Sequence, residues 1–167
     1  PVPIVIVQHM PKLFLESLVK RLDTQVPFTC GLAKHGQTLL PGHIYIAPGE
    51  QHLDIKKMGP DLEAFLHDGP AEHHCKPAVD VTFRSLAALA PRTKTLAIVL
   101  TGMGSDGALG AQAISDKGGY VIAQDQATSV VWGMPGATVR LGAAQDVLPL
   151  NAIAPALLNL IEQRMPA

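Results

Sequence analysis

The chain has 167 residues, of which 47% are hydrophobic and 16% are charged, and its formal net charge is −1. This composition is typical of one domain with a sizeable core. The charge balance argues against a basic nucleic-acid-binding surface and against a polybasic membrane-binding segment. Membrane insertion is excluded because no apolar run approaches the roughly 18 residues of a membrane helix. The sequence shows no pattern of a secretory signal, so we expect a cytoplasmic protein. Its two cysteines do not make a disulfide framework, and Cys30 and Cys75 are expected to be free thiols in that reducing compartment.

The first predicted elements are a strand, a loop and a helix. Residues 4–7 form a continuous apolar run, the pattern of a strand covered on both faces. His9 follows the end of this strand, and Pro11 can occupy the first turn of a helix. The apolar residues of that helix recur at helical spacing, at Leu15, Leu18, Val19 and Leu22.

Residues 27–68 are punctuated by glycine and proline, which predicts antiparallel hairpins. Residues 43–48 (HIYIAP) and 51–55 (QHLDI) alternate as strands do, with Pro-Gly between them, and residues 63–68 follow as a further strand. A second helix is predicted over residues 76–90.

The second half of the chain predicts a parallel βαβ unit. Residues 95–100 (TLAIVL) are a buried strand, followed by the glycine-rich stretch TGMGSDG and a helix that ends at Gly118-Gly119. Residues 120–124 (YVIAQ) are the next strand. Further helices are predicted within residues 133–142 and over residues 154–165. We therefore predict an α/β fold with a mainly parallel sheet and an antiparallel hairpin insertion.

Open α/β sheets bind ligands at the carboxyl ends of their strands, where His9 and the 101–107 loop are both expected. The loop glycines allow positive φ, and backbone N–H groups that enter a helix point toward an anion or an oxyanion. The loop is neither a P-loop nor a dinucleotide fingerprint. Three interpretations stay open: a tight turn with Asp106 as a helix cap, an anion or nucleotide site, and a triad in which Asp106 orients His9.

Spacing alone identifies no nucleophile. The five serines lie within predicted helices, beside Asp106, or outside any Gly-x-Ser-x-Gly elbow; they are Ser17, Ser85, Ser105, Ser115 and Ser129. Neither cysteine carries the local signature of a catalytic thiol.

Composition alone suggests a metal site, but spacing argues against one. His67, His73, His74 and Cys75 do not have the gaps, from two chain segments, at which zinc ligands occur. We therefore predict no metal site.

Six stretches, in this order, resemble the catalytic domain of the chemotaxis protein-glutamate methylesterase family (CheB-type): VIVQHMP, LPGHIYIAPG, HDGP, KPAVDVTF, LTGMGSDGA and AQDQATSVVWGMPGAT. The resemblance implies a serine hydrolase on a modified doubly wound α/β fold, without metal or organic cofactor. Its implied activity is removal of methyl esters from chemoreceptor glutamates and deamidation of certain glutamines. In this resemblance His9 matches the general base, Asp106 the acid that orients it, and the main-chain N–H of Met103 an oxyanion donor.

The resemblance also implies partners: methyl-accepting chemoreceptors, and a receiver domain that regulates the enzyme in cis or in trans. Residues 1–167 are expected to be one methylesterase catalytic domain that is incomplete at its N-terminus. The family's serine lies in a Gly-Ala-Ser-x-Gly-Gly turn after the first strand of the fold, and the sequence begins after that strand, its helix and the serine.

We therefore expect a fragment that lacks its nucleophile. Loss of the serine costs a hydrolase triad about 10⁶ in turnover, so the chain alone is predicted to be inactive. The uncovered sheet is expected to lower stability or to pair with another chain. The alternative is a non-catalytic receptor- or receiver-binding module on the same scaffold.

Overall fold

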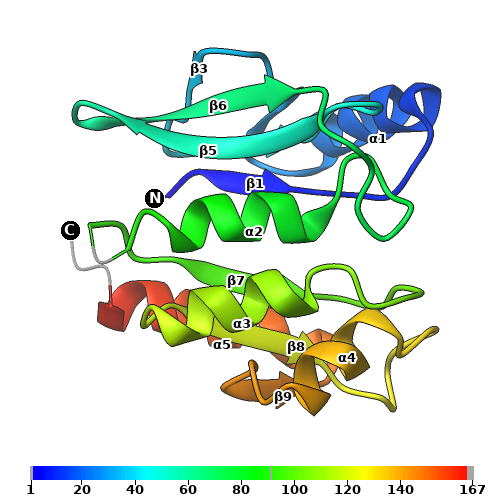
Figure 1. The fold of residues 1–167 in the computed structure, drawn as a ribbon. Helices are drawn as coiled ribbons and strands as arrows, with labels where there is room; N and C mark the ends of the chain where they lie inside the picture. The colour runs from blue at the N-terminus through cyan, green and yellow to red at the C-terminus, as the bar shows by residue number, and fades with distance from the viewer. Residues whose placement is uncertain (1, 91, 165–167) are drawn as a thin grey trace. The chain divides into compact units, whose positions relative to one another are not determined.

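The chain divides into two compact units, Pro1–Leu86 and Ala87–Ala167 (Figure 1). The computed structural model describes residues 2–90 and 92–164. Among these residues, no helix is both long enough and apolar enough to cross a lipid bilayer. Within these ranges, the N-terminal unit has two sheets and the C-terminal unit has one, and each unit is described by itself.

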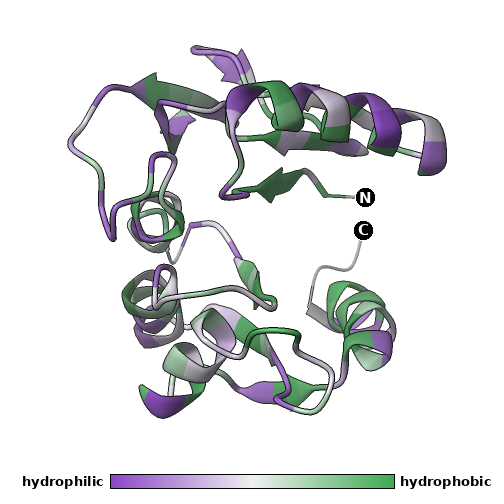
Figure 2. Ribbon diagram, turned by 90° about the vertical axis from the view of Figure 1, so that its right-hand side faces the viewer, coloured by the Kyte–Doolittle hydropathy of each residue, from purple (hydrophilic) through white to green (hydrophobic). Residues whose placement is uncertain are grey.

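The N-terminal unit begins with a parallel sheet of three strands. Strand β4 (His43–Ile46) lies between β1 (Ile4–Ile6) and β2 (Thr29–Leu32), parallel to both. Helix α1 (Lys12–Gln25) contributes the fully buried Leu15 to the core of this sheet. Figure 2 shows β1 as hydrophobic along its length and α1 as mixed, the pattern of a helix with one buried face. The predicted strand and helix are confirmed, and β2 is a strand that the sequence did not predict.

The antiparallel hairpin of this unit differs from the predicted one. Strand β5 (His52–Met58) pairs with β6 (Asp61–His67) around a turn at Gly59 and Pro60, and β3 (Gln37–Thr38) pairs with the other edge of β6. The predicted hairpin between residues 43–48 and 51–55 is therefore wrong. The reason is visible in β4, where three successive residues are buried, as in a strand covered on both faces.

Helix α2 (Val79–Ala87) is hydrogen-bonded to strand β5 through two side-chain hydroxyl groups. The Thr82 hydroxyl donates to the Leu53 carbonyl at 2.6 Å, and the Ile55 N–H donates to the Ser85 hydroxyl at 2.8 Å. The helix is shorter at both ends than the predicted residues 76–90, and its position against the hairpin is set by these polar contacts.

The C-terminal unit is built on a second parallel sheet with strand β8 at its centre. Its strands lie in the order β7 (Leu96–Val99), β8 (Tyr120–Gln124) and β9 (Asp146–Leu148). Its helices are α3 (Ala108–Asp116), α4 (Met134–Arg140) and α5 (Leu150–Arg164). Helices α3 and α5 lie on opposite faces of this sheet (Figures 1 and 2). The predicted βαβ unit is confirmed, and Gly118 follows α3 with φ +82°, as a C-terminal glycine should.

Candidate active site

His9 lies in the short turn that joins β1 to α1. The Met10 N–H donates to the Gln8 carbonyl at 3.0 Å, and the Pro11 carbonyl accepts from Leu15 at 3.1 Å in the first turn of the helix. The His9 side chain is half-buried. The structure thus places His9 just after the carboxyl end of a parallel strand, where the sequence predicted it, and its role as a base stays a prediction.

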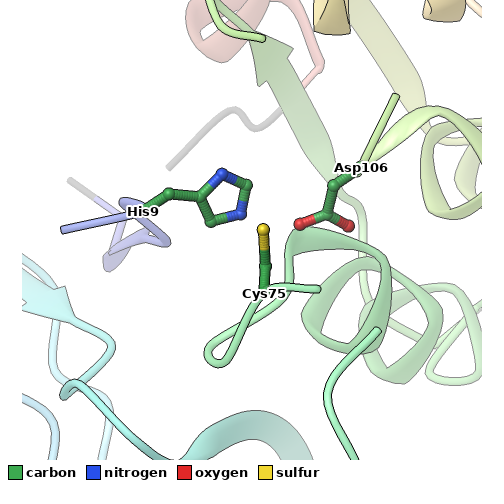
Figure 3. A group of neighbouring side chains, drawn as sticks. All are labelled: His9, Cys75 and Asp106. Atoms are coloured by element: carbon green, nitrogen blue, oxygen red, sulfur yellow. The ribbon is translucent and has the colours of Figure 1, made fainter. Parts of the chain in front are cut away.

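Cys75 is a close neighbour of His9 within the N-terminal unit. Its Sγ and a ring nitrogen of His9 lie within 4.8 Å of one another (Figure 3). The sequence did not predict this neighbour, because the two residues lie far apart in the chain and share no motif. Histidine nitrogen and cysteine sulfur are both common metal ligands, and a structural zinc site takes four such groups.

The loop that carries Cys75 is held by hydrogen bonds at both ends. The Glu72 N–H donates to the Cys75 carbonyl at 3.1 Å, and the Cys75 N–H donates to the Glu72 carbonyl at 2.8 Å. His73 and His74 lie between these two residues. Both histidines have positive φ, at 50° and 61°, which is uncommon for residues other than glycine. His73 Nε2 lies 2.8 Å from a carboxylate oxygen of the fully buried Asp80, and this contact fixes the loop to the start of α2.

The glycine loop, residues 101–107, packs closely against the start of α4 in the C-terminal unit. Gly104 and Gly107 have φ +88° and +90°, which favours glycine. A Cβ atom at Gly133 would lie 2.7 Å from the Gly102 carbonyl oxygen and 2.8 Å from the Gly104 nitrogen. Glycine at position 133 therefore permits an approach of two backbones that any other residue would prevent.

The buried side chain of Gln124 joins the glycine loop to the loop after β8. Its Oε1 accepts the Thr101 N–H at 2.8 Å, and its Nε2 donates to the Thr128 carbonyl at 2.8 Å. Its backbone carbonyl accepts the Trp132 indole N–H at 3.2 Å. The Thr101 hydroxyl also exchanges hydrogen bonds with the Val131 backbone, at 2.9 and 3.1 Å. These contacts hold the first residues of the glycine loop in one position.

Asp106 and Met103 have opposite environments in this loop. Asp106 is 2% exposed, whereas the Met103 side chain is 85% exposed. The N-cap of α3 is Gly107, the residue that follows Asp106, and the interpretation of Asp106 as a helix cap stays a prediction. No acceptor for the Met103 N–H lies among the residues that the structure describes. Its predicted role as an oxyanion donor requires a free N–H of this kind.

The family sequence model described as CheB methylesterase matches residues 1–157. The chain belongs to the CheB methylesterase family. It is 50% identical over 167 residues to a Nocardioides sp. protein named protein-glutamate methylesterase/protein-glutamine glutaminase, covering 99% of this chain and 45% of that protein. A Pseudomonas aeruginosa protein of this name, numbered 2, is 47% identical over 161 residues, covering 96% of this chain and 46% of that protein. The chain thus spans less than half the length of these curated CheB relatives.

The crystal structure of the Thermotoga maritima CheB methylesterase catalytic domain has the same fold. Its TM-score to this chain is 0.91 at 42% sequence identity, and the match covers 96% of this chain and 84% of that chain. The predicted fold class, a mainly parallel α/β fold of the CheB type, is confirmed by this match.

Proposed function

We propose that residues 1–167 are one catalytic domain, incomplete at its N-terminus, of a bacterial chemotaxis enzyme that removes methyl esters from chemoreceptor glutamates and deamidates glutamines. The observation that carries this proposal is the match of the CheB family model to residues 1–157. The names of the relatives, protein-glutamate methylesterase/protein-glutamine glutaminase, indicate the two reactions.

In the proposed mechanism, His9 takes the proton of a serine hydroxyl as the serine oxygen attacks the ester carbonyl. The negative charge that develops on the carbonyl oxygen is stabilised by the Met103 N–H. His9 then protonates the departing methanol, or ammonia from a glutamine, and activates the water that hydrolyses the acyl-enzyme. Asp106 holds the imidazole of His9 in the required tautomer.

We propose that none of the five serines of this chain is the nucleophile. Three of them donate to a carbonyl in their own segment: Ser17 to Leu13, Ser85 to Thr82 and Ser129 to Asp125. The Ser115 hydroxyl lies in helix α3 and accepts from Gln145. Ser105 adjoins Asp106 in the sequence, which leaves no room for a histidine between nucleophile and orienting acid.

The proposed partners are methyl-accepting chemoreceptors as substrates and a receiver domain as regulator. The proposed location is the cytoplasm. The free thiols of Cys30 and Cys75 are compatible with that reducing compartment.

Methanol release from methylated chemoreceptor tests the proposal. The turnover of the chain alone should be lower by about 10⁶ than that of the same chain extended at its N-terminus by the residues that its native gene encodes there. The reason is that a triad without its serine loses about that factor in turnover. In the extended protein, His9→Gln should lower turnover by about 10³ or more. Family-like methanol release by the chain alone would contradict the proposed place of the nucleophile. An inactive extended protein that still binds receptor would favour the non-catalytic binding module.

A further inference from the structure

The two thiols of the N-terminal unit have different environments. Cys30 is 9% exposed in strand β2, and burial, followed by the charge of Asp23, raises the pKa of its thiol. Cys75 is partly exposed on its loop, within 4.8 Å of a ring nitrogen of His9. A nearby imidazole favours the thiolate form of a cysteine, and the thiolate is the nucleophile. The environment of Cys75 is therefore that of a reactive thiol, and the environment of Cys30 is that of an inert one.

We propose that Cys75 is a covalent-modification site whose thiol is activated by His9 and reacts with low-molecular-weight disulfides. The proton of the thiol passes to the imidazole, and the thiolate attacks one sulfur of the disulfide. A new S–S bond forms at Cys75 as the disulfide's own S–S bond breaks. The other half leaves as a thiolate and takes the proton from the imidazolium. The exchange needs no further oxidant.

The Cys75 thiol has two acceptors available for its proton. The Sγ lies 3.4 Å from the His73 carbonyl oxygen, to which the thiol donates a weak hydrogen bond. When the S–H rotates toward His9, the imidazole can take its proton as a base. The His73 carbonyl can accept only a hydrogen bond. The proton transfer is thus a local rearrangement of one side chain.

The loop keeps the thiol beside His9 because its neighbours are fixed to helix α2. Arg84 of α2 donates to the Glu72 carboxylate at 2.6 Å, and His73 contacts Asp80 of the same helix at 2.8 Å. Glu72 and Cys75 share two backbone hydrogen bonds. A substituent on Cys75 would therefore remain next to the His9 ring. A substituent at this place would also block hydrolysis, a consequence that rests on the proposed function.

The test uses the chain as it is, with 5,5′-dithiobis(2-nitrobenzoic acid) as the disulfide and peptide mass spectrometry to locate the modification. In the folded chain Cys75 should react about tenfold or more faster than Cys30, and Cys75→Ser should remove the fast phase. His9→Gln should slow the reaction of Cys75 about tenfold, whereas His74→Gln, an adjacent exposed histidine, should leave it within about twofold. Equal rates for the two thiols, or a Cys75 rate that does not change in His9→Gln, would overturn the proposal.

A second measurement does not depend on the folding of a variant. In the wild-type chain, formation of the mixed disulfide at Cys75 should shift the NMR signals of the His9 ring more than those of the His43 ring. Equal shifts would overturn the proposed contact. Both readouts follow the thiol and not hydrolysis, so the proposed function and this inference can fail independently.

Discussion

At the scale of single residues, Gln124 contributes more to the candidate site than any motif in the sequence suggests. It is fully buried, and both ends of its amide have partners in the loops that meet at the site, at Thr101 and Thr128. An interior glutamine in a strand is an ordinary sequence feature. Only the structure shows that its amide orients the glycine loop.

Gln124→Leu should destabilise the chain by about 1–3 kcal/mol, because the buried amide loses its hydrogen bonds to the Thr101 N–H and the Thr128 carbonyl, each with a net value of about 0.5–1.5 kcal/mol. Urea unfolding measures the change. Gln112→Leu is the control, since the Gln112 amide donates to Asp116 at the exposed surface of α3, and loss of this bond should cost about 0.5 kcal/mol or less. Equal losses in the two variants would contradict the role of Gln124.

Gly133→Ala should cost about 1–3 kcal/mol, because a Cβ atom cannot fit 2.7 Å from the Gly102 carbonyl oxygen without moving the glycine loop. The control is Gly31→Ala, where a Cβ atom would meet nothing within 4 Å. Thermal unfolding of the two variants provides the comparison. A Gly133→Ala variant as stable as Gly31→Ala would show that the two backbones do not approach as described.

The ion pair between half-buried Lys76 and exposed Asp68 gives a prediction for pH. The hydrogen bond from the Lys76 ammonium, together with its charge, lowers the pKa of the Asp68 carboxyl. A carboxyl whose pKa is lower in the folded state contributes stability above its unfolded pKa and loses that contribution as the pH falls through its folded pKa. The contribution is small because the carboxylate is exposed. In NMR titrations, Lys76→Met should raise the Asp68 pKa to its ordinary range. An unchanged pKa would contradict the pairing.

At the scale of elements, one of the two hydroxyl groups that join helix α2 to strand β5 satisfies a buried backbone N–H. The Ser85 hydroxyl accepts from the Ile55 N–H at 2.8 Å and donates to the Thr82 carbonyl at 2.7 Å. Ile55 is 1% exposed, so water cannot replace the serine as acceptor.

Ser85→Ala should therefore destabilise the N-terminal unit by about 1–3 kcal/mol, the cost of a buried N–H without an acceptor. Hydrogen exchange of the Ile55 amide should become faster in the same variant. Ser17→Ala in α1 removes a hydroxyl that is exposed and bonds only within its own helix, and should have an effect below about 0.5 kcal/mol. Slow exchange at Ile55 in Ser85→Ala would contradict the proposed contact.

The elements that the sequence predicted are those with a strong local pattern, such as α1 and the β7-α3-β8 unit. Three strands escaped prediction for a physical reason. Strand β2 contains Gly31, which weakens a strand pattern, while β3 has only two residues and β9 only three. All three are strands because a neighbouring strand pairs with them. The partner of β4 was predicted incorrectly for the same reason, since parallel pairing joins segments that are distant in the chain.

At the scale of the whole molecule, the chain has two compact units joined near residue 87. Residues 92–95, just beyond the end of α2, form neither helix nor strand, and Arg92 and Lys94 in this segment are exposed. Such segments are preferred sites of proteolysis.

Limited trypsin digestion should therefore cleave first at Arg92 or Lys94 and give two fragments of similar size, which mass spectrometry identifies. Lys56 and Lys57 are also exposed, but they lie in β5 and are paired with β6, which should protect them. A first cleavage at Lys56 or Lys57 would contradict the position of the accessible junction.

The candidate site was predictable from sequence only in part. His9 and the glycine loop each follow a parallel strand, so their places in their own units followed from the pattern of the strands. The position of Cys75 beside His9 did not, because it depends on a loop with two residues at positive φ and on its anchor at Asp80. Such contacts depend on tertiary structure, which periodicity and motif spacing do not report.

The close approach of Gly133 to residues 102–104 has a consequence for how the proposed oxyanion donor works. The conformational entropy of the glycine loop is lost when the C-terminal unit folds, and not when a substrate binds. A donor at Met103 is then oriented before charge develops on the substrate, and no dipole needs to reorganise in the transition state. Substrate affinity is consequently not reduced by a cost of ordering this loop.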